Sequence, residues 1–187
     1  MEAMKKHNRE FVEQEGFKVF TATKFPRRKT AVVTCMDTRL VGLLEAALGL
    51  GQGDVKMIKN AGGLVTDPYG DTMRSLLVAI YELGVETVMI IPHTGCGVEG
   101  MDGAHFIKDM EKRGISPVTI KEIKAQGVDL EGWLTGFCDA EEAVRASVEL
   151  VANHPLLPEG ITVKGFIIDT ATGALREIDT TPDLEHN

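Results

Sequence analysis

Short apolar runs alternate with amphipathic stretches along most of this chain. Runs of about four to eight apolar residues are typical of buried strands, and stretches with a period near 3.6 residues are typical of helices. We predict strands over residues 30–35, 55–59, 85–92, 161–169 and 174–178. We predict helices over residues 3–15, 40–48, 71–83, 102–113 and 139–153.

The stretch 116–137 has no clear period. We expect a short strand near 118–121 and a short helix near 130–137. Downstream, Asp139 is a good N-cap for the helix that follows it. The segment 170–173, Thr-Ala-Thr-Gly, joins the last two predicted strands and favours a hairpin there.

Strands and helices alternate up to that hairpin, which indicates an α/β fold with its sheet covered on both faces. We expect a single domain over residues 1–187. Its central, mainly parallel sheet should hold about four parallel strands plus an edge hairpin strand, flanked by helices. Residues 1–28 should form an N-terminal helical arm.

Composition narrows the class of protein. The 187 residues are 43% apolar and 26% charged, as in an ordinary globular domain. The net charge is −8 and the one basic run, residues 24–29, is expected to be a solvated connector, so nucleic acid is not an expected partner. No apolar run approaches the ~20 residues of a membrane span. The first ten residues lack the layout of a signal peptide, so we expect a cytoplasmic protein without a membrane partner.

Candidate metal ligands stand at the ends of two predicted strands. Cys35 and Asp37 lie where the first strand ends, and His93 and Cys96 follow the third. Residues two apart on an extended strand end point to the same side, and α/β proteins place their chemistry at such ends. With Cys35, His93 and Cys96 as ligands, Zn²⁺ would keep one position for water or for Asp37, as catalytic zinc sites do.

Two other interpretations stay open. Each residue alone could be a buried cysteine, a core histidine or a surface aspartate. Alternatively, Cys138 could complete a structural zinc site with four protein ligands. The chain has only three cysteines, an odd number that argues against a disulfide framework and leaves thiols for metal.

Two neighbouring features extend the candidate site. Arg39 could hold the Asp37 carboxylate with both ends of its guanidinium and keep it ionised. The loop after the second strand contains Asn60, Gly62 and Gly63, and its missing side chains would let a small substrate approach the backbone. We expect these three residues to line a substrate pocket.

The pattern Cys35-x-Asp37-x-Arg39, followed by His93-x-x-Cys96, resembles the β-class carbonic anhydrases. The segment 60–63, Asn-Ala-Gly-Gly, resembles the Asn-Ala-Gly stretch of that family. The resemblance implies a zinc ion bound by the two cysteines and the histidine, with the aspartate and arginine as a catalytic dyad beside its open position.

The resemblance also implies an activity and an assembly. The family hydrates carbon dioxide reversibly to bicarbonate and a proton by attack of a zinc-bound hydroxide. Two thiolate ligands should make the bound water less acidic than three histidines would, so more activity is expected at alkaline pH. A homodimer, or a tetramer built from such dimers, is expected, with the N-terminal helix packing on the partner subunit.

Several details are left open by the resemblance. In some relatives the resting site is closed, with the aspartate bound to zinc as a fourth ligand. Asp37 could therefore bind zinc at low pH and return to Arg39 at higher pH. His105 is one candidate for a proton shuttle, beside water and buffer. Lys59 stands where many relatives carry arginine, and aromatic residues make up only 5%. A carbonyl sulfide or carbon disulfide hydrolase with the same centre is therefore an alternative, as is a non-catalytic binding module with structural zinc.

Overall fold

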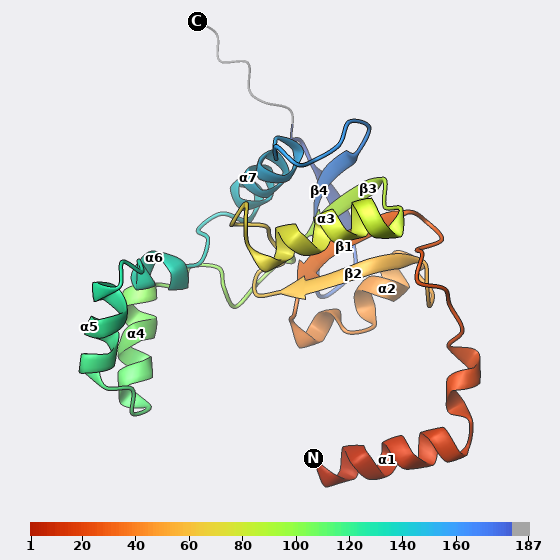
Figure 1. The fold of residues 1–187 in the computed structure, drawn as a ribbon, viewed down its shortest axis with the longest axis horizontal. Coiled ribbons are helices and arrows are strands. Elements are labelled where there is room, and N and C mark those ends of the chain that lie inside the picture. The colour runs from red at the N-terminus through yellow and green to blue at the C-terminus, as the bar shows by residue number, and fades with distance from the viewer. Residues whose placement is uncertain (181–187) are drawn as a thin grey trace, which may run out of the picture.

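A five-stranded sheet forms the centre of the computed structural model, which describes residues 1–180 (Figure 1). The order is β2-β1-β3-β4-β5, where the strands are β1 (Thr30–Cys35), β2 (Val55–Asn60), β3 (Thr87–Ile91), β4 (Thr162–Ile168) and β5 (Leu175–Ile178). The first four run parallel and β5 pairs antiparallel with β4. The predicted mainly parallel sheet with an edge hairpin strand is confirmed. The last part of the predicted domain, residues 181–187, lies outside the described residues.

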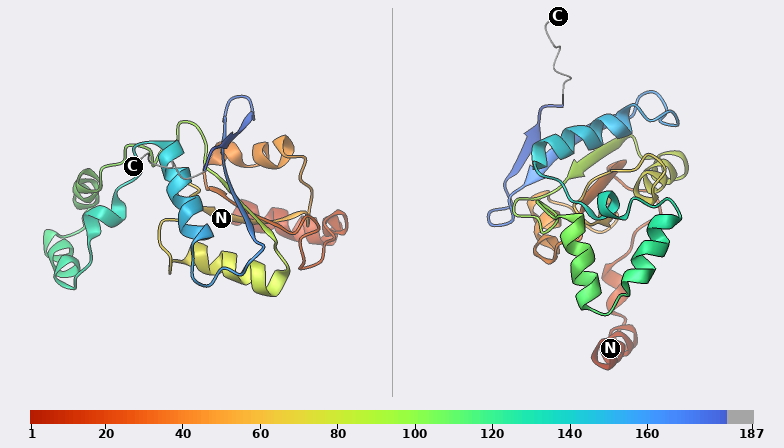
Figure 2. Two further views of the ribbon diagram at one scale, coloured as in Figure 1. Left: turned by 90° about the horizontal axis from the view of Figure 1, so that it is seen from above. Right: turned by 90° about the vertical axis from the view of Figure 1, so that its left-hand side faces the viewer.

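Helices cover both faces of the sheet. The helices α3 (Asp71–Leu83) and α7 (Ala140–Ala152) lie on one face and α2 (Leu43–Ala47) on the other, as the left view of Figure 2 shows for α3 and α2. Ala31 and Val33 pack in the first layer and Val32 in the second, and all three are fully buried. A strand buried on both faces has no polar alternation, which is why three consecutive apolar residues, 31–33, stand at the centre of β1.

Two helical segments extend away from this core (Figure 1). A helical lobe of α4 (Gly103–Lys112), α5 (Pro117–Ala125) and α6 (Leu130–Leu134) has a small core of its own, formed by Ile107, Ile120, Leu130 and Leu134. At the other end, α1 (Glu2–Glu13) and a 3₁₀ turn (Gly16–Val19) bury none of their residues. Among the described residues, no helix combines the length and the apolarity needed to cross a membrane.

The strand expected near 118–121 is wrong, because this segment belongs to α5. The β-branched run Val118-Thr119-Ile120 favours a strand locally. Ser116 overrides this preference, since its hydroxyl caps the helix by accepting a hydrogen bond from the Val118 N–H, and Pro117 occupies the first turn. The helix then buries Ile120 and packs Ile123 beside it.

The single helix expected over 40–48 is divided. A 3₁₀ turn (Thr38–Leu40) comes first, and α2 follows after Gly42. Gly42 has φ +84°, a left-handed conformation that ends the first turn and that glycine adopts without strain.

The basic side chains of the connector before β1 are exposed, as expected, but the connector is also anchored. Arg27 donates to the Asp54 carboxylate at 2.9 Å, and Arg28 lies 3.6 Å from its second oxygen. The Gly51 N–H and Arg27 together lower the pKa of Asp54 below its ordinary value. These contacts hold the end of the N-terminal arm against the turn that precedes β2.

A packing test follows from the contact between β4 and α7. A Cβ on Gly165 would lie 2.2 Å from the Val144 side chain and 3.1 Å from that of Val148. Gly165→Ala should therefore lower the free energy of unfolding by about 1–3 kcal/mol, because an overpacked core must shift. Urea denaturation measures it. The neighbouring exposed Lys164→Ala serves as control, and equal stability of both variants would contradict the packing described.

Candidate metal centre

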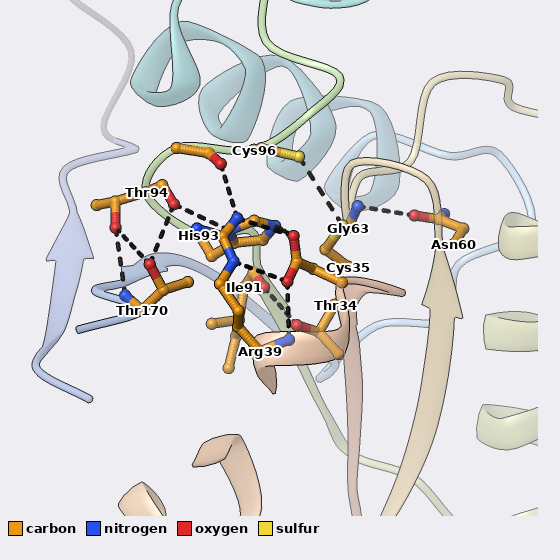
Figure 3. Close-up of polar contacts among 12 residues, drawn as sticks. Thr34, Cys35, Arg39, Asn60, Gly63, Ile91, His93, Thr94, Cys96 and Thr170 are labelled. Carbon is orange, nitrogen blue, oxygen red and sulfur yellow. Dashed lines mark hydrogen bonds and ion pairs between the residues drawn. The ribbon is translucent and has the colours of Figure 1, made fainter. Parts of the chain in front are cut away.

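Three buried side chains converge at the carboxyl ends of β1 and β3 (Figure 3). Cys35 ends β1, while His93 and Cys96 lie on the loop after β3. Their ligand atoms all lie within 4.8 Å of one another, and the two sulfur atoms are 3.8 Å apart. The exposed fractions are 4% for Cys35, 0% for His93 and 6% for Cys96. The structure therefore brings together the three ligands that were predicted from sequence.

The chemistry of this cluster fits a metal ion. His93 Nε2 is buried without a hydrogen-bond partner in the described part of the chain, while Nδ1 lies 3.0 Å from the Thr94 carbonyl oxygen. An unpaired buried polar atom costs about 1–3 kcal/mol. Burial and the nearby Cys35 raise the pKa of the Cys96 thiol, so a thiolate there needs a compensating cation. Two sulfur atoms and one imidazole nitrogen are a ligand set that suits Zn²⁺.

Cys138 does not join this cluster. It is exposed and precedes α7, outside the group of three potential ligands found among residues 1–180. The four-ligand structural site that Cys138 would complete is therefore not formed in this structure. A three-ligand site leaves a coordination position for a small molecule.

Asp37 lies beside the cluster, but outside the strand that was expected to carry it. Strand β1 ends at Cys35, and Asp37 caps the 3₁₀ turn by accepting a hydrogen bond from the Arg39 N–H at 2.8 Å. The turn still orients the carboxylate toward the cluster, with Oδ2 lying 3.7 Å from His93 Nε2. The closed state, with Asp37 as a zinc ligand, stays a prediction.

Arg39 holds the Asp37 carboxylate at both oxygen atoms. Its Nε donates to Oδ1 at 2.9 Å and its Nη2 to Oδ2 at 2.8 Å, the two-point geometry expected of an arginine–carboxylate pair. The side-chain and backbone hydrogen bonds from Arg39 hold the pKa of Asp37 well below its usual range. Asp37 is therefore an ionised acceptor in a fixed orientation.

Arg39 makes one further contact that has no signal in the sequence. Its Nη2 also donates to the Gly95 carbonyl oxygen at 2.8 Å, across 56 positions of sequence. The guanidinium thus connects the turn after β1 with the loop that carries His93 and Cys96. A backbone carbonyl leaves no residue-type signal, so only the fold reveals this contact.

The glycine loop after β2 is organised by Asn60. The Asn60 side chain accepts from the Gly63 and Leu64 N–H groups and donates to the Leu64 carbonyl and to Thr72 Oγ1, at 2.7–3.3 Å. Gly63 has φ +72°, and a Cβ there would lie 2.6 Å from the Cys35 backbone nitrogen. Gly63 therefore permits close packing of this loop on the strand that carries a candidate ligand.

Two of the three predicted pocket residues line a cavity. Asn60 and Gly62 belong to the wall of a cavity of about 630 Å³, whose apolar lining includes Val98, Trp133 and Phe137. Gly63 shapes the loop instead of lining this space. That the pocket holds substrate stays a prediction.

His105, the candidate proton shuttle, lies on α4 in the helical lobe. Its ring is exposed and pairs with Asp109 one turn along the same helix, at 3.4 Å. The shuttle assignment stays a prediction that these contacts do not support.

Comparison with known proteins agrees with this geometry. A family model described as carbonic anhydrase matches residues 30–175. The YvdA protein of Bacillus subtilis (strain 168) is 45% identical over 169 residues, covering 90% of this chain and 86% of its own length. A carbon disulfide hydrolase of Acidithiobacillus thiooxidans is 32% identical over 157 residues, covering 80% of this chain and 76% of its own.

A solved structure shows the same fold. The β-carbonic anhydrase isoform I of the protozoan Trichomonas vaginalis superimposes with a TM-score of 0.83 at 34% sequence identity, covering 95% of this chain and 96% of that one. The family model spans most of the chain, including all three cluster residues and the Asp37–Arg39 pair. The chain therefore belongs to the β-carbonic anhydrase family.

Proposed function

We propose that this protein catalyses the zinc-dependent, reversible hydration of carbon dioxide to bicarbonate and a proton. The observation that carries the proposal is the convergence of two buried thiols and the buried His93 Nε2, which has no hydrogen-bond partner in the described chain, beside a carboxylate fixed by arginine. We propose that Cys35, His93 and Cys96 hold Zn²⁺, the ion whose ligand preferences match this set.

Zinc bound there would lower the pKa of water toward about 7 and so supply a nucleophile near neutral pH. The protein's own residues orient that nucleophile. Asp37, ionised and held at two points by Arg39, would accept a hydrogen bond from a nucleophile bound there and so orient it toward the carbon of the substrate. Arg39 keeps this carboxylate in place and ties it to Gly95 on the opposite loop.

A second candidate substrate class follows from the comparisons. A relative named as a carbon disulfide hydrolase is 32% identical to this chain, and carbonyl sulfide and carbon disulfide are linear molecules like carbon dioxide. The same centre could attack either of them. A binding module with structural zinc is disfavoured, because such a site needs neither the dyad nor an open coordination position.

We further propose a homodimer, or a tetramer of such dimers, built through the N-terminal arm. Phe17, Val19 and Phe20 are 49%, 79% and 56% exposed in the single chain. Exposed apolar side chains on a projecting segment are typical of an interface with another subunit. We propose a cytoplasmic location because all three cysteines are free, as a reducing compartment keeps them.

The proposed activity can be tested with Asp37→Asn. The variant keeps the shape of the side chain but loses its charge, so carbon dioxide hydration should fall by about 10²–10⁴-fold. Zinc content should stay unchanged, because Asp37 is not one of the three proposed ligands. Stopped-flow hydration at neutral and alkaline pH measures the rate, and metal analysis measures zinc. Glu177→Gln makes the same carboxylate-to-amide change at an exposed position on β5 and is the matched control.

The same set of proteins also distinguishes carbon dioxide from the sulfur-containing substrates. Fast hydration by the wild-type protein and the Glu177→Gln control, lost in Asp37→Asn, is the expected result. A zinc-loaded wild type that leaves carbon dioxide unreacted but releases sulfide from carbonyl sulfide or carbon disulfide would replace the proposed substrate. If Asp37→Asn kept its activity, the proposed catalytic role of the Asp37–Arg39 pair would be wrong.

Zinc affinity should depend on pH in a defined direction. Because burial raises the pKa of the Cys96 thiol, protons compete with zinc for this ligand. The affinity should therefore rise as pH increases from about 6 to about 8, with protons released on binding. Competition titration against a chromophoric chelator measures it. An affinity that is constant over this range would argue against thiolate ligation.

The assembly can be tested by removing residues 1–20. Sedimentation velocity should show a smaller species than the full-length protein, because the exposed apolar arm would no longer reach a second subunit. In the full-length chain, Phe20→Asp should weaken association while Lys18→Asp, on the same segment, should not. An unchanged mass in both the truncated and the Phe20→Asp protein would contradict the proposed interface.

A further inference from the structure

The proposed zinc ligand His93 must present a lone pair from Nε2. A neutral imidazole does so only when the proton resides on the other ring nitrogen, Nδ1. In this structure Nδ1 lies 3.0 Å from the Thr94 carbonyl oxygen, an atom that can only accept. The position of that carbonyl therefore selects the tautomer and orients the ring.

The Thr94 peptide is itself held by the end of β4. The Thr94 N–H donates to the Ile168 carbonyl at 3.0 Å, and the Ile168 N–H donates to the Pro92 carbonyl at 3.0 Å. His93 and Ile168 form a parallel bridge beyond the regular ladder of β3 and β4. Strand β4 therefore continues to pair with the backbone that carries His93, beyond the end of β3.

Thr170 adds side-chain contacts to the same peptide (Figure 3). The Thr170 N–H donates to Thr94 Oγ1 at 3.2 Å. The Thr170 hydroxyl lies 3.5 Å from Thr94 Oγ1 and 3.5 Å from the Thr94 carbonyl oxygen, the atom that faces His93 Nδ1. The Thr170 hydroxyl and the His93 ring therefore both approach the Thr94 carbonyl oxygen.

A rigid turn places Thr170. The Asp169 carboxylate accepts from the Ala171 N–H at 3.0 Å, and from the N–H and hydroxyl of Thr172 at 2.7 and 2.8 Å. These bonds, led by those from Thr172, hold the pKa of Asp169 below its ordinary value. The β4–β5 hairpin thus presents Thr170 in a fixed position next to the proposed metal centre.

We infer that Thr170, acting through Thr94, is a positioning residue for the metal-binding imidazole of His93. It keeps the Thr94 carbonyl where it holds the proton on Nδ1, and so leaves Nε2 free for the ion. The inference rests on the proposed zinc site. Mutation of a group that orients a metal-bound histidine through its other ring nitrogen typically lowers metal affinity by about 10–100-fold.

The test compares conservative variants of two threonines in one turn. Thr170→Val keeps the β-branched shape and removes only the hydroxyl, Thr170→Ser restores the hydroxyl, and Thr172→Val removes a hydroxyl that contacts Asp169 but not Thr94. Zinc affinity is measured by chelator competition. The His93 tautomer is measured in the metal-free protein from ¹⁵N chemical shifts of the imidazole nitrogens.

Thr170→Val should weaken zinc binding by roughly tenfold and reduce the population of the Nδ1–H tautomer. Thr170→Ser should restore both, and Thr172→Val should leave both near wild type. If Thr170→Val had the zinc affinity and the His93 tautomer of the wild type, the inference would be wrong. It would also be wrong if Thr172→Val lost as much zinc affinity as Thr170→Val, because the effect would then come from the turn as a whole. Neither readout requires turnover, so a zinc-loaded protein that fails to hydrate carbon dioxide would refute the proposed function alone.

Discussion

The parallel pairing of β1 with β3 is the constraint on which the candidate centre depends. Thr34 stands opposite Ile91, and the Thr34 hydroxyl donates to the Ile91 carbonyl at 2.7 Å. This register places the end of β1, with Cys35, beside the loop that carries His93 and Cys96. A slip of one residue would turn Cys35 to the other face of the sheet and dissolve the ligand set.

Near this pairing of β1 with β3, two buried groups are in environments that lower the stability of the fold. Within residues 1–180, the His93 Nε2 atom is buried without a hydrogen-bond partner, and the Cys96 thiol is buried where its ionisation is disfavoured. Unfavourable local environments of this kind are expected at functional sites. The contacts of Arg39 with Asp37 and Gly95, and those of Asn60 with its own loop, fix the surrounding backbone. The site is thus preorganised by hydrogen bonds that do not involve the proposed ligand atoms.

The sheet and the ligand set could be predicted because their signals are local. Strands β1 and β3 each contain a short apolar run, and the candidate ligand pairs follow these two strands, where the parallel fold must bring them together. The hairpin was visible from the Thr-Ala-Thr-Gly turn. The strand predicted near 118–121 failed because β-branched residues carried more weight in the prediction than the cap at Ser116 and Pro117. Contacts such as Arg39 with Gly95 were beyond reach, since a backbone carbonyl has no sequence signature and the partners lie far apart.

Membership of the family establishes the fold, and the identity of the ion and of its ligands can be measured directly. X-ray absorption at the zinc edge of the purified protein measures it without turnover. The account predicts two sulfur atoms at about 2.3 Å, one imidazole nitrogen at about 2.0 Å and one further light atom. A shell without sulfur, or with more than two sulfur atoms, would contradict the assignment of Cys35, His93 and Cys96.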